Sequence, residues 1–275
     1  MTRERSTLQV LAKAGFSDLS AAQERLGELG WEPGVFERSA DPDASLATCL
    51  ALRDAHPGPW AALIRSARAR DALVVLTGMS QGLTDFLLRR PEQWTLFTEP
   101  LTVLPAAQGW VELYSSVTRD LEPIEAVVAL RVQYRRNLCQ LALFDALTED
   151  PREVLPQVAA CLADMAGACL EVALDIARRQ HSLPAEDVPL SIIGMGKTGA
   201  RELNYLSDVD VIYVTEVPEG AQSETVLQGA TLLARETARN LMEFGAEPGL
   251  WEVDANLRPE GKDGALVRTL ESHLA

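Results

Sequence analysis

The sequence has little basic charge and few aromatic side chains, and it contains no long apolar run. Its 25 Lys and Arg residues stand against 40 Asp and Glu residues, a formal net charge of -15. Because nucleic acids and anionic membranes repel such a surface, neither is an expected partner. No stretch of about 18 apolar residues is present to span a membrane, and the first residues lack the apolar core of a signal peptide. We therefore expect a cytoplasmic protein.

Cysteine and histidine are also scarce. The four cysteines contain no Cys-x-x-Cys pair, and the three histidines are scattered along the chain. A zinc site or a Ser-His-Asp triad needs such residues in groups, so neither is predicted. Cys161 and Cys169 lie eight residues apart in an apolar helical pattern, which favours small buried side chains.

The first part of the chain has the pattern of helices. Apolar residues recur every three or four positions from Leu155 to Ile176, as on one face of a helix. Asp150 and Pro151 are suited to cap this helix and to form its first turn. Further helical segments are expected around residues 8–29, 46–53, 60–76 and 124–147.

The pattern changes near residue 185. Beyond it, short β-prone segments alternate with one helical stripe, at residues 188–193, 209–214, 223–244 and 251–254. The hydrophobic content of 47% and the charged content of 24% are ordinary for a globular protein of one or two domains. We predict an α+β fold, with a mostly helical region over residues 1–185 and a small mixed-sheet domain over residues 186–275.

A glycine-rich loop, GMGKTG at residues 194–199, lies between the first two predicted strands. A nucleoside-triphosphate P-loop would need a glycine at position 191, where the chain has Ser191. A dinucleotide fingerprint fits the three glycines, and Glu216 lies at the distance of a ribose contact. However, only residues 200–207 separate the loop from Asp208, which is too short for the helix of a parallel crossover. Both alternatives are therefore disfavoured.

The acidic residues after the loop form a more specific pattern. Asp208 and Asp210 alternate with Val209 at the start of a strand, so their carboxylates should share one face while Val209 and Val211 turn to a core. Two close carboxylates repel each other unless a cation neutralises them, and Mg²⁺ prefers oxygen ligands. Asp254 ends a later predicted strand and supplies a third acid. Three acids around two metal ions can form a clamp for in-line displacement at phosphorus.

Two long segments resemble one family. Residues 193–213, IGMGKTGARELNYLSDVDVIY, are similar to the first signature of the glutamine synthetase adenylyltransferase / adenylyl-removing enzymes. Residues 253–267, VDANLRPEGKDGALV, resemble their second signature, and residues 78–92 resemble an early Gly-x-Ser … Arg-His-Pro-Glu stretch. Ala200 and Ala265 depart from the family pattern, which often has glycine at the first position and usually proline at the second.

The resemblance implies a nucleotidyltransferase domain over residues 186–275. Family members are longer and carry two such domains. The first removes AMP from a tyrosine of glutamine synthetase with phosphate and releases ADP, and the second transfers AMP from ATP to that tyrosine. This chain resembles the first half, so we expect glutamine synthetase as its protein substrate and a nitrogen-signalling protein as a regulatory partner. We also expect a fragment truncated after residue 275; the alternative is an incomplete fragment that serves as a docking module.

The chemistry of individual residues predicts their roles in such a site. Asp208, Asp210 and Asp254 are expected to be catalytic and to ligate Mg²⁺, with two ions in the site and with ATP, ADP and phosphate as substrates or products. Glycines let the backbone approach phosphate oxygens without obstruction by a Cβ atom. The residues expected at the nucleotide or phosphate are Gly194, Gly196, Lys197, Ser207, Arg258 and Lys262. Glu202 and Asn204 belong to the first signature without an assigned role.

Overall fold

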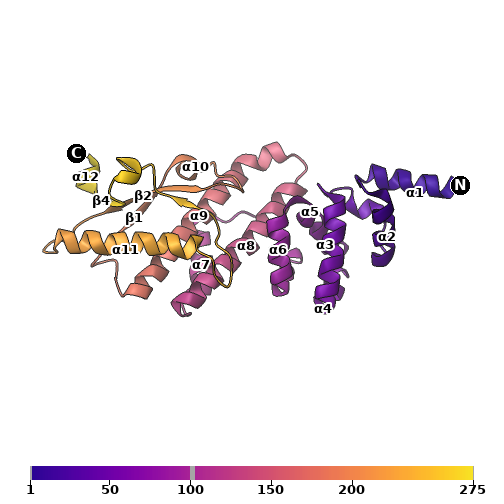
Figure 1. Cartoon of the computed structure of the whole chain (residues 1–275). Helices are drawn as coiled ribbons and strands as arrows, with labels where there is room; N and C mark the ends of the chain where they lie inside the picture. The colour runs from indigo at the N-terminus through magenta and orange to yellow at the C-terminus, as the bar shows by residue number, and fades with distance from the viewer. Residues whose placement is uncertain (1, 100–102, 275) are drawn as a thin grey trace. The chain divides into compact units, whose positions relative to one another are not determined.

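The computed structural model describes residues 2–99 and 103–274, and the chain divides into two compact units (Figure 1). Within the described residues, no helix combines the length and the hydrophobicity that a membrane span requires. The first unit comprises Met1–Thr102 and Arg135–Pro151, and the second comprises Val103–Tyr134 and Arg152–Ala275.

The first unit is helical, as the sequence predicts. Asp18, Asp41, Ser66 and Ser80 each cap a helix, because their side chains accept a hydrogen bond from a backbone N–H in the first turn. The predicted segment 8–29 forms two helices, since the first one ends before Gly15, whose φ is +93°. The elements are α1 (Thr2–Lys13), α2 (Leu19–Leu29), η1 (Pro33–Phe36), α3 (Pro42–Ala55), α4 (Pro57–Leu63), α5 (Ala67–Met79), α6 (Gln81–Arg89), η2 (Pro91–Phe97) and the second half of α8 (Pro123–Leu147).

The segment at residues 78–92 builds the junction of α5, α6 and η2. A Cβ atom on Gly78 would overlap the Ser39 side chain, so glycine permits a close approach of α5 to that loop. Ser80 ends α5 and caps α6. The Trp94 indole N–H then donates to the Leu87 carbonyl at 2.9 Å. The residues of this segment that resemble the family stretch therefore have a role in packing.

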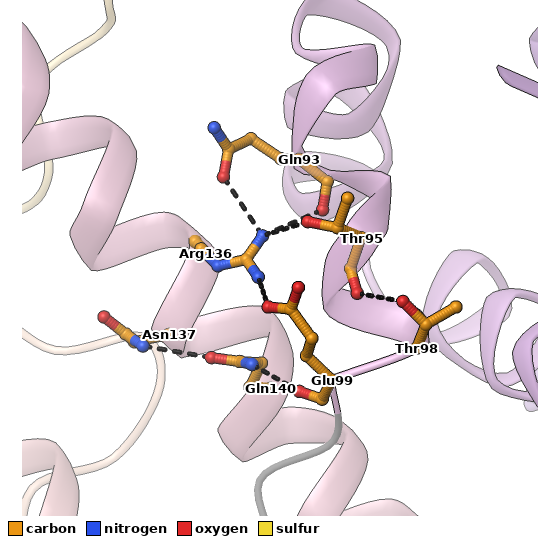
Figure 2. A network of polar contacts seen from close by, with 7 residues as sticks. All are labelled: Gln93, Thr95, Thr98, Glu99, Arg136, Asn137 and Gln140. Carbon is orange, nitrogen blue, oxygen red and sulfur yellow. Dashed lines mark hydrogen bonds and ion pairs between the residues drawn. The ribbon is translucent and has the colours of Figure 1, made fainter.

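A polar network joins the end of η2 to α8 (Figure 2). The Arg136 guanidinium donates to the Gln93 carbonyl at 3.2 Å and to Thr95 Oγ1 at 3.1 Å, and it pairs with a Glu99 carboxylate oxygen at 2.6 Å. Gln140, one turn further along α8, donates to the Glu99 carbonyl at 2.7 Å. Because one cation holds several groups at the end of η2, it fixes that end against α8.

We expect Arg136→Met to lower the free energy of unfolding by about 2 kcal/mol, because several charge-assisted hydrogen bonds are lost together. Urea unfolding of the whole chain measures this difference. Arg65→Met is the control, since Arg65 is exposed and its replacement should change stability by less than about 0.5 kcal/mol. Equal effects of the two substitutions would contradict a stabilising role for the network.

The second unit combines long helices with a small mixed sheet, which confirms the predicted α+β fold. Val209 and Val211 on the central strand are fully buried, as the alternating pattern predicts. Helix α11 packs against β2, β3 and β4. The elements are α7 (Ala107–Thr118), the first half of α8, α9 (Pro151–His181), β1 (Ser191–Gly194), α10 (Gly196–Gly199), β2 (Val209–Thr215), α11 (Ser223–Met242), β3 (Val253–Asp254), η3 (Gly261–Asp263), β4 (Val267–Thr269) and α12 (Leu270–Leu274).

Strand β2 is the centre of the sheet. β1 pairs with it antiparallel along one edge, while β3 and β4 pair with it parallel along the other. The antiparallel pairing of β1 and β2 excludes the dinucleotide fingerprint, because that motif joins parallel strands through a crossover helix. The glycine loop instead turns through the short α10. The boundary near residue 185 stays a prediction; it falls between the end of α9 and the start of β1.

Candidate metal centre

Three carboxylates converge at the start of β2. Asp210 lies directly beside Asp254, because these two residues are partners in the parallel pairing of β2 and β3. Asp208 precedes β2 and is exposed, whereas Asp210 and Asp254 are half-buried. One carboxylate oxygen of each residue lies within 4.8 Å of those of the other two. The structure thus brings together the three acids that the sequence singles out.

The cluster leaves Asp210 poorly stabilised as an anion. Its pKa is raised above the ordinary value, first by desolvation and then by the negative charges of Asp208 and Asp254. The ammonium group of Lys197 acts in the opposite direction and lowers the pKa. A cation bound among the three carboxylates would remove the repulsion that raises this pKa.

The glycine loop packs directly on Asp210. Gly196 has a φ of +50°, and a Cβ atom there would lie 2.7 Å from Asp210 Oδ2. The Met195 N–H donates to the Asp210 carbonyl at 2.8 Å, which continues the pairing of β1 and β2 into the loop. Gly199 has no room for a side chain either, because its Cβ atom would overlap the Gly194 carbonyl. Glycine at position 196 therefore allows the backbone to reach the carboxylate, and glycine at position 199 allows the loop to close against Gly194.

Lys197 and Ser207 lie on the segment that connects the loop to Asp208. Lys197 is exposed, and its Nζ donates to Asn204 Oδ1 at 3.2 Å. This contact gives Asn204 a role that the sequence leaves open: it orients the lysine. Ser207 Oγ donates to Asp208 Oδ1 at 3.4 Å, and the Glu202 N–H donates to the Lys197 carbonyl at 2.8 Å.

An ion pair that the sequence does not predict secures the same segment. Arg201 has a φ of +58°, a conformation that is unfavourable for a residue with a side chain. Its Nε and Nη2 atoms donate to the two oxygens of Asp164 on α9, at 3.0 and 2.6 Å. This bidentate contact ties the segment to α9. Asp164 is one of three acids on α9 between Leu155 and Ile176, so the sequence pattern does not single it out.

The loop after β3 is stabilised by its own residues. Asp254 Oδ1 accepts a hydrogen bond from the Asn256 N–H at 2.7 Å. The Arg258 guanidinium donates to the carbonyls of Ala255, Lys262 and Gly264, at 2.6, 3.1 and 3.2 Å. In this structure, Arg258 therefore braces the loop.

Lys262 is exposed on η3, within the loop that Arg258 braces. Its backbone carbonyl accepts one of the Arg258 hydrogen bonds. The ammonium group of Lys262 is thus carried on a fixed turn, whereas the guanidinium of Arg258 is taken up by three carbonyl groups. Of the two residues, Lys262 is the better suited to meet an anionic ligand.

The donor set fits a hard divalent cation. All three converging groups are carboxylates, which suit Mg²⁺ or Mn²⁺ rather than a soft metal. The missing Cβ atom of Gly196 lets the loop backbone lie against the Asp210 carboxylate, whose pKa is raised by desolvation and by the charges of Asp208 and Asp254. The arrangement can therefore hold a cation next to backbone amides that are able to meet phosphate oxygens.

Comparison with known proteins identifies relatives for nearly the whole chain. The model of the glutamate-ammonia ligase adenylyltransferase family matches residues 71–274. A bifunctional glutamine synthetase adenylyltransferase/adenylyl-removing enzyme from Leifsonia xyli subsp. xyli is 44% identical, covering 100% of this chain and 30% of the relative. Enzymes of the same name from Streptomyces avermitilis and Mycobacterium tuberculosis are 40% and 36% identical, covering 99% and 100% of this chain and 28% of each relative. The chain thus spans less than a third of the length of these relatives.

Proposed function

The chain belongs to the glutamate-ammonia ligase adenylyltransferase family, and from this premise we propose that it removes AMP from a tyrosine of glutamine synthetase. The reaction is a phosphorolysis that depends on a divalent cation and releases ADP. The observation that carries the proposal is the convergence of Asp208, Asp210 and Asp254 beside a glycine loop. The similarity of both signatures to the first half of the family enzymes favours removal over addition of AMP.

In this proposal, Asp208, Asp210 and Asp254 hold Mg²⁺, with two ions in the site. The metal supplies positive charge that stabilises the charge developing on the transferred phosphoryl group. The carboxylates fix the place of that charge, because two of them are locked in register on neighbouring strands. The protein itself thus contributes a rigid arrangement of ligands.

The loop residues position the phosphate groups. Backbone N–H groups around Gly194 and Gly196 meet phosphate oxygens, and Lys197, oriented by Asn204, adds a positive charge. Ser207 and Lys262 complete the proposed phosphate contacts. In the reaction, an oxygen of inorganic phosphate forms a bond to the adenylyl phosphorus. The bond from phosphorus to the tyrosine oxygen breaks, and that oxygen leaves as the phenol with the proton that the attacking hydrogen phosphate gives up.

The direct test uses AMP-modified glutamine synthetase with inorganic phosphate, Mg²⁺ and this chain. The expected result is ADP release that chelation of the metal abolishes and that Asp208→Asn/Asp210→Asn removes. If the folded wild-type chain instead adds AMP to unmodified glutamine synthetase from ATP, the proposed direction is wrong. If it does neither, this chain by itself does not carry the activity.

A nitrogen-signalling protein is proposed as the regulator of this chain, and adding that protein should change the rate of ADP release.

The pKa of Asp210 leads to a prediction for metal binding. Mn²⁺ competes with the proton on this carboxyl group, so the affinity should fall as pH decreases through the raised pKa. Lys197→Met removes the cation that lowers this pKa, and the fall should therefore begin at a higher pH. Mn²⁺ titrations followed by electron paramagnetic resonance at a series of pH values measure the shift. Lys13→Met, which makes the same change in net charge in the first unit, should leave the profile in place.

The raised pKa of Asp210 also determines how this group's contribution to folding stability changes with pH. In the metal-free protein the folded state holds the Asp210 proton more tightly than the unfolded chain does. This group therefore favours folding at low pH, and its contribution is lost as pH rises through the raised pKa. A contribution from Asp210 that grows with pH in the metal-free protein would contradict the direction of the pKa shift.

A further inference from the structure

The connection between α11 and β3 determines where Asp254 lies. Strand β3 consists of Val253 and Asp254 alone, so it has few contacts of its own to define its position. The pairing with β2 extends by one further hydrogen bond, from the Val209 N–H to the Glu252 carbonyl at 2.8 Å. The place of the third carboxylate thus depends on how residues 243–252 are held.

Arg131 on α8 binds the end of α11 and the middle of this connection. Its side chain is buried, with 3% of the residue exposed. The guanidinium donates to the Asn240 carbonyl at the end of α11 through Nε and Nη2, at 3.0 and 2.8 Å. Its Nη1 donates to the Glu247 carbonyl in the connection at 2.7 Å. Carbonyls at the end of a helix lack partners within the helix, and a cation is favourable there.

The rest of the connection is tightly built around these contacts. The Leu250 N–H donates to the Leu241 carbonyl at 2.8 Å, and a Cβ atom on Gly249 would overlap the carbonyl of Met242. Tyr134, three residues after Arg131 and thus on the same face of α8, meets the Trp251 ring edge-on with centroids 6.4 Å apart. The first half of α8 therefore contacts the connection at two residues, Glu247 and Trp251, before the chain enters β3.

We propose that Arg131 is a positioning residue for the metal centre. It ties the end of α11 to the Glu247 carbonyl and thereby fixes the connection that presents Asp254 beside Asp210. This role rests on the proposed function, which assigns Asp254 to the metal. A guanidinium suits the task because its planar fork donates in several fixed directions, whereas a lysine offers one compact head.

The test is a set of Mn²⁺ titrations of the full chain, read by electron paramagnetic resonance, with thermal unfolding measured in parallel. We expect Arg131→Gln to weaken Mn²⁺ binding about 10-fold, as for other residues that orient metal ligands. Arg131→Lys should recover part of the affinity. In an Asp254→Asn background, Arg131→Gln should change the affinity less than about 2-fold, because the ligand it positions is already lost.

Arg178→Gln is the matched control. Arg178 on α9 also donates to connection carbonyls, those of Leu183 and Val188, but this connection leads to β1, which carries no acid. Its loss should reduce stability and leave the Mn²⁺ affinity unchanged. If Arg131→Gln does not fold, Arg131→Lys is compared with Arg178→Lys in the same way.

Three results would overturn the inference: unchanged Mn²⁺ affinity in Arg131→Gln, an equal loss in Arg178→Gln, or a full loss that persists in the Asp254→Asn background. A failure of the proposed function at its metal site gives a different result from these three. The wild-type chain itself would then show no Mn²⁺ binding that depends on Asp210.

Discussion

Asp210→Asn should reduce the proposed metal-dependent release of ADP by about 10³-fold, which corresponds to about 4 kcal/mol of transition-state stabilisation. Asp210 is the central carboxylate: it is paired in register with Asp254, and its pKa responds to both neighbouring acids. The amide of asparagine has nearly the same shape but carries no negative charge. The substitution therefore removes the charge that binds the metal and keeps the volume of the side chain.

Folding should survive this change. The raised pKa shows that the Asp210 anion is disfavoured in the folded, metal-free protein. Replacing it relieves repulsion, so metal-free Asp210→Asn should unfold at the same temperature as the wild type or at a higher one. Asp187→Asn, at an exposed position in the same unit, is the control and should alter neither rate nor stability. Turnover near the wild-type rate in Asp210→Asn would show that this carboxylate is not needed.

Gly196→Ala should have the second largest effect, a loss of about 10²-fold in turnover together with weaker Mn²⁺ binding. Alanine pays about 1–2 kcal/mol to adopt the left-handed backbone conformation found here. In addition, its Cβ atom would lie 2.7 Å from Asp210 Oδ2, so the carboxylate or the loop must move. A displacement of about 1 Å in a catalytic group is enough to cost about 10²-fold in rate.

A substitution at Gly220 distinguishes the effect of backbone strain from the effect of the contact with Asp210. Its φ is +80°, and apart from Gly220 and its two chain neighbours, no residue that the structure describes has an atom within 4 Å of the place of a Cβ atom. Gly220→Ala therefore carries a similar backbone strain without touching the acids. We expect it to lower stability by the backbone strain alone, about 1–2 kcal/mol, and to leave Mn²⁺ affinity and turnover unchanged. If both substitutions impair the site equally, strain alone accounts for the effect of Gly196→Ala.

The acidic site could be predicted because it depends on local rules. The alternation at the start of β2 puts Asp210 on the face opposite to Val209, and Asp208, which directly precedes the strand, was expected on the face of Asp210 by the same rule. Glycines that open a tight loop are likewise visible in the sequence. The place of Asp254 is less local, since its pairing with Asp210 needs a register between strands that are far apart in the chain.

What escaped prediction consists of contacts between distant elements. The pattern of α8 and α9 gives their helical form, but nothing in it shows that Arg131 binds the end of α11 or that Asp164 binds Arg201. The phosphate role expected of Arg258 stays a prediction; its guanidinium donates to three carbonyls of its own loop, which the sequence did not indicate. The partners of these side chains depend on the tertiary structure, so the local sequence pattern does not reveal them.

The most direct measurement of the metal centre is an equilibrium Mn²⁺ titration of this chain without substrate, followed by electron paramagnetic resonance. The wild type is compared with Asp208→Asn/Asp210→Asn, and Mg²⁺ is added as a competitor. If the three carboxylates form the site, the wild type binds Mn²⁺, Mg²⁺ displaces it, and the double variant loses the binding while remaining folded. Equal binding by the folded wild type and the double variant would contradict the assignment of the metal to these acids.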